Sequence, residues 1–295
     1  MMKISNFNVP KTHSESFWVD DYKGRSFFSK LHIHPEIQIT FIKKATGNVL
    51  SGGYYGSFYT GEVYVIGSNI PHVFRSDGDE EPTGENAVSI IFKPDILGEQ
   101  FLALPECEVL KEWLENTRHC MKINPADSIE IGAAIERAAE SWGFDKILHF
   151  MKILHLCVNT EFTLLAPNAK KVYNESETKT LDKILQFTFS NFKQEVTINK
   201  IADLACMSPA SFCRYFKSKT QKTYIQFLNE VRIANACKLL MDRDVTIAES
   251  ARLSGYNNLT YFNRKFKQVK NLTPSSYIKV VEKRTFDHNK RANHA

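Results

Sequence analysis

The chain has 295 residues, of which 43% are hydrophobic and 24% charged, a composition that is ordinary for a globular protein and predicts about two domains. It has no run of about eighteen apolar residues and no basic-then-apolar leader, so we expect neither a membrane-spanning nor a secreted protein, and favour the cytoplasm. The six cysteines form no C-x-x-C pair and no regular framework, which indicates unpaired thiols in a reducing compartment.

The net charge of +5 hides an asymmetry along the chain. Residues 178–295 carry 21 Lys and Arg residues against 9 Asp and Glu residues, a net charge of +12, whereas the rest carries 17 against 24, a net charge of −7. A basic part beside an acidic part suggests a polyanion as the partner of the basic part only. Taken alone, the charge is equally consistent with a solvated basic surface.

The region from residue 14 to about 93 is typical of short strands. Apolar stretches alternate there with glycine turn signals, at 27–28, 37–42, 63–66 and 88–92. This spacing predicts an antiparallel β-barrel or jelly roll. The acidic stretch 77–85 reads as a surface loop.

A group of histidines lies within the predicted strands, at His32, His34 and His72, with Glu36 and Gln38 beside them. Residues two apart in a strand point the same way, so His32 and His34 can share one target inside a barrel, and Glu36 and Gln38 keep that parity. Three imidazoles and one oxygen ligand would suit zinc or non-haem iron. Hydrogen bonding at the strand ends, or direct binding of an organic ligand, is the favoured alternative, because the best-placed oxygen donor is the uncharged Gln38.

From Pro94 onward the pattern becomes helical, with helices expected within about 98–162. The predicted ranges are Val109–Cys120, Ser128–Trp142 and a third helix over about 147–158 that Asp145 caps. The third helix is apolar over most of its circumference and must be covered on more than one side. Packing within the chain and contact with a partner subunit are both open. The polar stretch 166–178 is interpreted as an interdomain linker.

The second predicted domain, residues 179–283, contains one short pattern twice. Phe212–Lys217 and Phe262–Lys267 both read F-x-R-x-F-K, at an offset of 50 residues. The match extends upstream, because Thr197-Ile198 pairs with Thr246-Ile247 at an offset of 49. Two copies are too few for a solenoid, so we interpret them as two small helical units of one design.

Each copy has the pattern of a helix-turn-helix motif. Thr197 is the expected N-cap of a first short helix, and Ser208-Pro209 begins a second helix. In the second copy, Asn257 or Asn258 caps the corresponding helix. One helix over Thr223–Met241 would connect the units and, at 1.5 Å per residue, span roughly 28 Å, near the roughly 34 Å between successive major-groove entries of B-DNA. Ile225, Leu228, Val231, Ala234, Ala236, Leu239 and Leu240 are its expected core positions.

The outward faces of the two second helices supply the candidate DNA-binding residues. These are Ser208, Ala210, Ser211, Cys213, Arg214 and Lys217 in the first unit, and Asn258, Leu259, Thr260, Asn263, Arg264 and Lys267 in the second. Arginine reads guanine and asparagine suits adenine, each good pair giving about 1–3 kcal/mol of discrimination. Lys217 and Lys267 are expected to contact DNA phosphates. A phosphate contact, in place of a base contact, is also the alternative role for Arg214 and Arg264.

The C-terminal part resembles the double helix-turn-helix domain of AraC/XylS-type transcriptional regulators over about a hundred residues. The matching features are Ile201-Ala202, 208–217, Arg232, Ala236, Gly255-Tyr256, Tyr261-Phe262, Phe266-Lys267 and 273–277. The N-terminal part is similar, more loosely, to the cupin-type sensor domain of these regulators, through His32-x-His34 and Pro71-His72. Gln221 and Asn271 stand where the family usually has glycine. Ser250 stands where it usually has isoleucine, and this would loosen the core of the second unit.

This resemblance implies a two-domain α+β regulator with a cupin-like barrel, no catalytic residues and no certain cofactor. It further implies double-stranded DNA as a partner, a small-molecule effector, a homodimer and RNA polymerase as an additional partner. The alternative class is a metal-dependent cupin enzyme fused to a DNA-binding domain, with His32, His34 and His72 as ligands. A third reading makes residues 1–165 a dimerisation scaffold only. We expect residues 284–295 to be disordered.

Overall fold

The computed structural model describes residues 15–24, 31–76, 85–117, 119–165, 175–241 and 244–280. Contacts between Cα atoms divide the chain into two compact units, Met1–Asp182 with Lys219–Gln221, and Lys183–Ser218 with Lys222–Ala295. The proposed linker 166–178 lies mostly outside the described residues, and its last residues already belong to helix α5 (Glu175–Asn191). The predicted loop 77–85, except its last residue, and the tail 284–295 lie outside them too.

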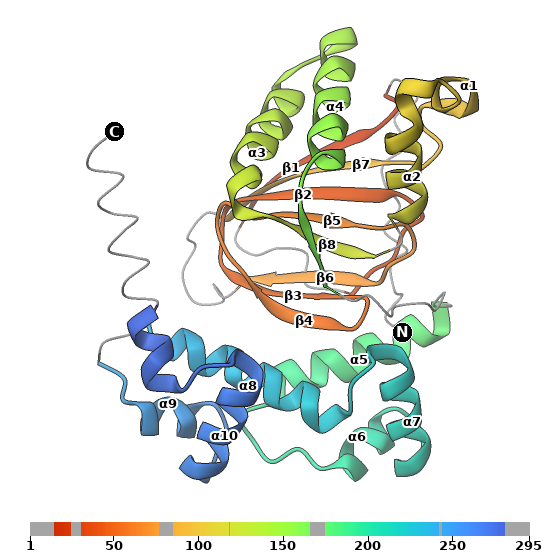
Figure 1. Ribbon diagram of the computed structural model, residues 1–295. Coiled ribbons are helices and arrows are strands. Elements are labelled where there is room, and N and C mark those ends of the chain that lie inside the picture. The colour runs from red at the N-terminus through yellow and green to blue at the C-terminus, as the bar shows by residue number, and fades with distance from the viewer. Residues whose placement is uncertain are drawn as a thin grey trace. The chain divides into compact units, whose positions relative to one another are not determined.

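The first unit is built on two antiparallel sheets (Figure 1). The larger has the strand order β1-β7-β2-β5-β8-β9 and the smaller β4-β3-β6. Their bounds are β1 Trp18–Gly24, β2 Ile37–Lys44, β3 Gly47–Ser51, β4 Tyr54–Phe58, β5 Val63–Ile66, β6 His72–Ser76, β7 Glu85–Phe92, β8 Cys120–Ile123 and β9 Phe162–Leu164. The antiparallel strands are as predicted, but the prediction of a closed barrel is wrong. Among the described strands no ladder joins the two sheets, so each sheet keeps two edge strands.

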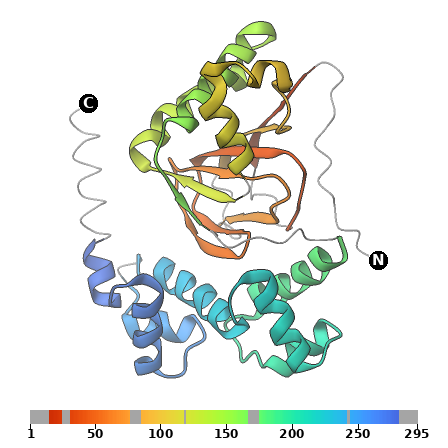
Figure 2. The same ribbon diagram turned by 45° about the vertical axis from the view of Figure 1, so that its right-hand side comes forward.

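Helices cover one face of the larger sheet (Figures 1 and 2). They are α1 Gly98–Leu102, a 3-10 turn at Pro105–Cys107, α2 Glu108–Asn116, α3 Pro125–Glu140 and α4 Gly143–Val158. Helix α3 begins before the predicted Ser128, because the side chain of Asn124 accepts from the backbone N–H of Ala126. The prediction that Asp145 caps α4 is wrong, since Asp145 lies inside the first turn. Cys120, predicted to end a helix, begins β8 instead.

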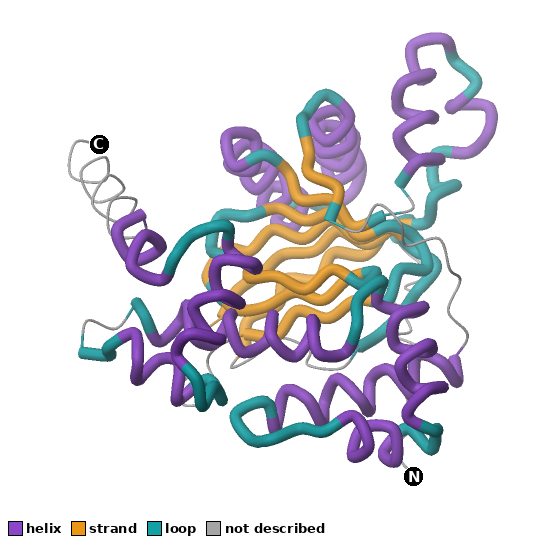
Figure 3. Tube along the Cα trace, turned by 60° about the horizontal axis from the view of Figure 1, so that its bottom comes forward, coloured by secondary structure: helices purple, strands orange, loops and turns teal. Residues whose placement is uncertain are grey.

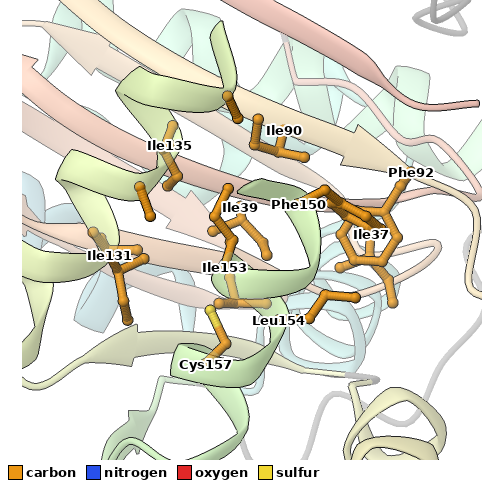
Figure 4. Close-up of a cluster of buried hydrophobic side chains, with 14 of the residues drawn as sticks. Ile37, Ile39, Ile90, Phe92, Ile131, Ile135, Phe150, Ile153, Leu154 and Cys157 are labelled. Atoms are coloured by element: carbon orange, nitrogen blue, oxygen red, sulfur yellow. The ribbon is translucent and has the colours of Figure 1, made fainter. Parts of the chain in front are cut away.

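Alternation along β2 separates the two faces of the larger sheet. Ile37 and Ile39 are fully buried in the cluster beneath the helices. Figure 4 shows them with Phe150 and Ile153 of α4, and with Ile131 of α3. The intervening residues of β2 project to the opposite face, toward the smaller sheet. The core of the unit is therefore apolar on the helix side, and the polar residues of β2 are left for the space between the sheets.

The second unit consists of helices joined by short loops (Figure 3). Its elements are most of α5, then α6 Ile198–Leu204, α7 Pro209–Thr220, α8 Tyr224–Leu239, α9 Ile247–Leu253, α10 Leu259–Lys270 and a further helical segment over 274–280. The pairs α6–α7 and α9–α10 lie at opposite ends of α8 (Figures 1 and 2). At 16 residues, α8 is about 24 Å long, shorter than predicted.

The core face of α8 was predicted only in part. Leu228, Val231, Ala236 and Leu240 are buried as expected, but Ile225 is 42% exposed. Tyr224, Phe227 and Ile233 are buried instead. One side of α8 packs on α7 and another on α9 and α10, so its burial pattern does not follow one apolar stripe.

Candidate functional site

The two copies of the repeated sequence pattern fold into two helix-turn-helix motifs whose first helices begin with the same kind of N-cap. Thr197 Oγ1 accepts a hydrogen bond from the backbone N–H of Lys200 at 3.3 Å, which begins α6. Thr246 does the same for Glu249 at 3.2 Å at the start of α9. Each cap satisfies one of the N–H groups that a helix N-terminus leaves unpaired. Both predicted first helices are confirmed, and so is the N-cap predicted at Thr197; the cap at Thr246 was not predicted.

The second helix of each unit is also capped by its own side chain. Ser208 Oγ accepts from the backbone N–H of Ser211 at 3.3 Å at the start of α7. Asn258 Oδ1 accepts from the N–H of Tyr261 at 2.8 Å at the start of α10, so Asn258, rather than Asn257, is the cap. These bonds fix the first turn of each helix, where a DNA-reading helix places its contacts.

Paired phenylalanines hold the inner face of each second helix. Phe212 and Phe216 are fully buried with ring centroids 5.8 Å apart, and Phe262 and Phe266 are fully buried 5.6 Å apart. Residues four apart lie on one face of a helix, so each pair anchors one side of its helix to the core. The opposite side of each helix is thereby fixed outward.

The twelve candidate DNA-binding residues lie at the surface of α7 and α10 or at their caps. Ser211 is half-buried, and the others are exposed: Ser208, Ala210, Cys213, Arg214, Lys217, Asn258, Leu259, Thr260, Asn263, Arg264 and Lys267. Their exposure makes them available to a partner. Their contact with DNA stays a prediction.

The two copies hold their arginines differently. Arg214 donates from Nη2 to Ser211 Oγ at 3.3 Å. The guanidinium of Arg264 instead lies over the ring of Tyr261, 5.2 Å from its centroid. Tyr261 also lines a surface hollow with Asn258, Thr260 and Arg264. Tyr261 was not among the candidate DNA-binding residues, although Tyr261-Phe262 is one of the features that resemble the regulator family. An aromatic residue three positions before an arginine on one helix face could have indicated it.

Arg232 connects α8 to the segment that follows α5. It donates from Nε to the carbonyl oxygen of Phe192 and from Nη2 to that of Gln194, both at 2.8 Å. Burial lowers the pKa of Arg232, although its guanidinium remains charged at neutral pH. Gly255 has φ +85°, and a Cβ there would approach the Phe192 oxygen to 2.7 Å, so glycine is required at this turn.

Ser250, where the sequence predicted a looser core, has its buried hydroxyl paired within the fold. Its side chain is fully buried, and Oγ donates to the carbonyl oxygen of Ala236 at 3.1 Å. A buried hydroxyl destabilises a core mainly when it lacks a partner. Here it hydrogen-bonds α9 to α8.

The three histidines of the first unit come together. Ring nitrogens of His32, His34 and His72 lie within 4.8 Å of one another, and all three side chains are buried. Gln38 Oε1 is 3.1 Å from His34 Nε2 and 3.2 Å from His72 Nε2. The cluster that the sequence suggested therefore exists, although the predicted strand through its first two members does not. His32 forms an isolated bridge to His72, and β2 begins only at Ile37.

Main-chain carbonyl groups orient two of these rings. His72 Nδ1 is 2.8 Å from the oxygen of Ile70, and His34 Nδ1 is 3.1 Å from the oxygen of Glu36. Burial lowers the pKa of His34 and, together with the neighbouring imidazoles, lowers that of His72 further. The Glu36 carboxylate is 3.7 Å from His34 Nδ1, on the ring edge away from Gln38, so it does not join the cluster.

A cavity of about 80 Å³ lies beside the cluster, between the two sheets. Its lining is Asp20, Tyr22, His32, Gln38, Thr40, Ile42, Phe74, Ala87, Ser89 and Ile91. Thr40 and Ser89 are register partners on β2 and β7, and their hydroxyl oxygens are 2.9 Å apart. Burial raises the pKa of Asp20. Asp20, Thr40 and Ser89 were not among the candidate residues predicted from the sequence. Parity with Gln38 could have indicated Thr40, but the pairing of β2 with β7 could not be predicted from the sequence.

Comparison with known proteins adds to this geometry. Residues 201–279 match a family model described as a helix-turn-helix domain. The chain is 30% identical over 111 residues to the HTH-type transcriptional regulator YdeC of Bacillus subtilis, covering 37% of this chain and 38% of YdeC. It is 26% identical over 218 residues to the HTH-type transcriptional regulator AlkR of Acinetobacter baylyi, covering 71% of each. The crystal structure of the DNA-binding domain of AdpA with a target DNA matches 36% of this chain and 95% of that domain at 23% identity and a TM-score of 0.34.

The matched region spans the two capped units. It identifies residues 201–279 as a helix-turn-helix domain, as the repeat predicted. The chain spans little more than a third of the length of YdeC, and the matched domain model does not extend to residues 1–200. Across the described residues, no helix is both long and apolar enough to cross a membrane.

Proposed function

We propose that the chain is a sequence-specific, DNA-binding transcriptional regulator whose first unit binds a small molecule and forms a homodimer. The main support is the repeated construction of the second unit. Each copy has a capped second helix, a buried phenylalanine pair and an outward face bearing one arginine and one lysine of the F-x-R-x-F-K pattern. That is the arrangement by which a recognition helix enters a major groove.

In this proposal the outward residues divide into two roles. Arg214 and Arg264 contact base edges, with Asn263 available for adenine. Lys217 and Lys267, one helical turn further along, contact phosphates and provide affinity that falls with salt. The two copies read DNA differently, because Arg214 is held by a serine hydroxyl and Arg264 by an aromatic ring.

Selection of bound DNA from a random pool tests the proposal. We expect one enriched sequence, bound at least about 10³-fold more tightly than random DNA at physiological salt. Repeating the selection with Arg214→Ala and Arg264→Ala should relax different positions of that sequence. Recovery of no enriched sequence by the full chain would contradict sequence-specific binding.

The small-molecule part of the proposal rests on the cavity between the sheets. A mostly apolar wall carries a few convergent polar groups, Asp20, Gln38, Thr40 and Ser89, which is typical of a binding pocket. A thermal-shift screen of the full chain against metabolites, with a Ser89→Leu variant that fills the cavity, would identify ligands that use this site. A stabilising ligand should lose its effect in the variant.

The homodimer part rests on the outer face of α4. Phe150, Ile153 and Leu154 are buried against the sheet, whereas Phe144 is 70% and Leu148 52% exposed on the other side. A helix that is apolar on both sides favours a second partner. We propose that this partner is α4 of a second copy, because an isologous contact uses the same apolar face twice.

A further inference from the structure

The arginine in each copy of the F-x-R-x-F-K pattern is contacted by the residue three positions before it. In α7, Arg214 donates from Nη2 to Ser211 Oγ at 3.3 Å. In α10, Cζ of Arg264 lies over the ring of Tyr261, 5.2 Å from its centroid. Residues three apart lie on one helix face, so the two contacts have equivalent positions and different chemistry. A hydroxyl holds one arginine, and an aromatic ring holds the other.

This difference decides how many N–H donors each guanidinium keeps for a partner. A guanidinium has five N–H donors in one plane, and the bond to Ser211 uses one of those of Arg214. An aromatic ring attracts a cation through its quadrupole and requires no N–H group. Among the described residues, Arg264 makes no hydrogen bond and no ion pair. All five donors of Arg264 therefore remain for a partner.

The ring of Tyr261 is fixed from the core of the second unit. Tyr261 is half-buried and packs on the apolar cluster beneath α9 and α10. Its centroid is 6.1 Å from that of Tyr256, which is 4% exposed. The guanidinium of Arg232 lies 5.5 Å from the Tyr256 centroid, on the far side of this pair in the chain of contacts. A continuous row of contacts, Arg232–Tyr256–Tyr261–Arg264, thus connects α8 to the exposed face of α10.

A DNA base has room to approach this exposed end of the row. Tyr261 and Arg264 line a surface hollow together with Asn258 and Thr260. Asn258 caps α10, so the hollow lies at the first turns of the helix, where a DNA-reading helix contacts base edges. Because no described residue uses the donors of Arg264, a base can accept from them without breaking an existing hydrogen bond.

Bidentate contact with O6 and N7 of guanine needs two N–H donors and a guanidinium plane aligned with the base edge. An arginine that is positioned before binding loses less rotamer freedom when it binds. We propose that Tyr261 is a specificity-determining residue, whose ring positions the Arg264 guanidinium for bidentate contact with guanine. This inference rests on the proposed function, in which Arg264 contacts a base edge. Tyr261 acts through Arg264 and is a positioning residue.

A second cation lies near the same ring and provides a matched control. Lys265 Nζ is 5.5 Å from the Tyr261 centroid, and it donates to Gln268 Oε1 at 3.1 Å. Lys265→Gln removes this cation and leaves the contact between Tyr261 and Arg264 in place. The preference for guanine at the position that Arg264 reads should be no lower in this variant than in the original chain.

The test is selection of bound DNA from a random pool with the full chain, followed by competition binding at each position of the enriched sequence. Arg264→Ala identifies the position that this arginine reads, through a loss of guanine preference of about 5- to 150-fold. Tyr261→Leu should lower the preference at that position by about 2- to 5-fold, as expected for an exposed cation–π contact, and at no other position. Tyr261→Phe keeps the ring and should rescue the preference.

The guanine preference is a ratio of two affinities, so a partly unfolded variant loses both affinities equally and keeps its ratio. This separates positioning of Arg264 from a purely structural role of Tyr261. If Tyr261→Leu does not fold, Tyr261→Met decides, because the flexible methionine side chain fills irregular gaps.

The outcomes distinguish this inference from the regulator proposal. If Arg264→Ala relaxes one position and the folded Tyr261 variant relaxes none, the inference is overturned and the regulator proposal stands. Equal relaxation in Lys265→Gln and Tyr261→Leu would also overturn it, because the ring would then not act through Arg264. An enriched sequence that Arg264→Ala leaves unchanged at every position overturns base reading by Arg264, and this inference with it.

Discussion

The hydroxyl of Tyr256 donates a hydrogen bond of 2.9 Å to Oδ1 of Asn229, and both side chains are almost completely buried. Asn229 lies on α8 and also donates from Nδ2 to the carbonyl oxygen of Ile225 at 2.7 Å. Tyr256 belongs to the turn between α9 and α10. This one bond therefore connects α8 to the turn between α9 and α10.

Tyr256→Phe should destabilise the second unit by about 1–3 kcal/mol, because it leaves a buried amide oxygen without one of its donors. Chemical denaturation followed by circular dichroism measures the change. Tyr59→Phe, at a 46% exposed tyrosine, is the control and should change little. Equal stability of Tyr256→Phe and the original chain would show that the bond contributes nothing net.

Arg214→Ala and Lys217→Ala should affect DNA binding in different ways. Loss of Arg214 should reduce the preference for the selected sequence over random DNA by about 1–3 kcal/mol. Loss of Lys217 should weaken both DNAs equally and lower the salt dependence by about one phosphate contact. Fluorescence anisotropy at several salt concentrations distinguishes them. If Arg214→Ala weakened both DNAs equally, base reading by this residue would be wrong.

Gln221→Gly should stabilise the protein by about 0.5–1 kcal/mol. Gln221 has φ +60°, in the left-handed region where a Cβ is unfavourable and glycine is not. Asn271 occupies the corresponding position in the second copy of the repeat, at φ +56°. Asparagine tolerates the left-handed conformation better, so Asn271→Gly should increase the stability less. Gln268→Gly, within α10, is the control and should destabilise by about 1 kcal/mol. Thermal unfolding measures all three, and a loss of stability in Gln221→Gly would contradict the argument.

Phe144→Glu should separate the proposed dimer into monomers. A carboxylate on the exposed apolar face of α4 would be desolvated between two copies, and the two copies would carry it at the same place. Sedimentation velocity measures the change in mass. Val109→Glu replaces a 61% exposed residue of α2 and should leave the mass unchanged. An original chain that sediments as a monomer at micromolar concentration would exclude this contact.

Local signals made the second unit predictable. Thr197, Thr246 and Asn258 cap helices within three residues of themselves, so the sequence pattern contains both partners of each bond. The phenylalanine pairs are equally local, four residues apart. The burial of α8 was harder to predict. Ile225 is exposed and Phe227 is buried, although both are apolar, and the difference depends on which other helices pack against each side of α8.

The first unit depended more on distant pairing. The histidines could be selected from residue type, yet their meeting depends on β2, β6 and the bridge between His32 and His72. The cavity depends on the register that places Ser89 beside Thr40, 49 positions apart in sequence. Strand spacing alone cannot tell a closed barrel from two sheets, because closure is decided by which edges pair.

The hydroxyl groups of Thr40 and Ser89 have two protons between them, and one of these protons lies between the two oxygen atoms. While Gln38 donates to Thr40, the second proton is free to point into the cavity, so the wall offers a donor to a carbonyl or carboxylate oxygen. If the Gln38 amide is rotated by half a turn, its oxygen accepts from the Thr40 hydroxyl, both hydroxyl protons are engaged, and Thr40 and Ser89 offer only lone pairs to the cavity. The orientation of the Gln38 amide would thus decide whether this part of the cavity prefers an acceptor or a donor on a small molecule, without any movement of the main chain.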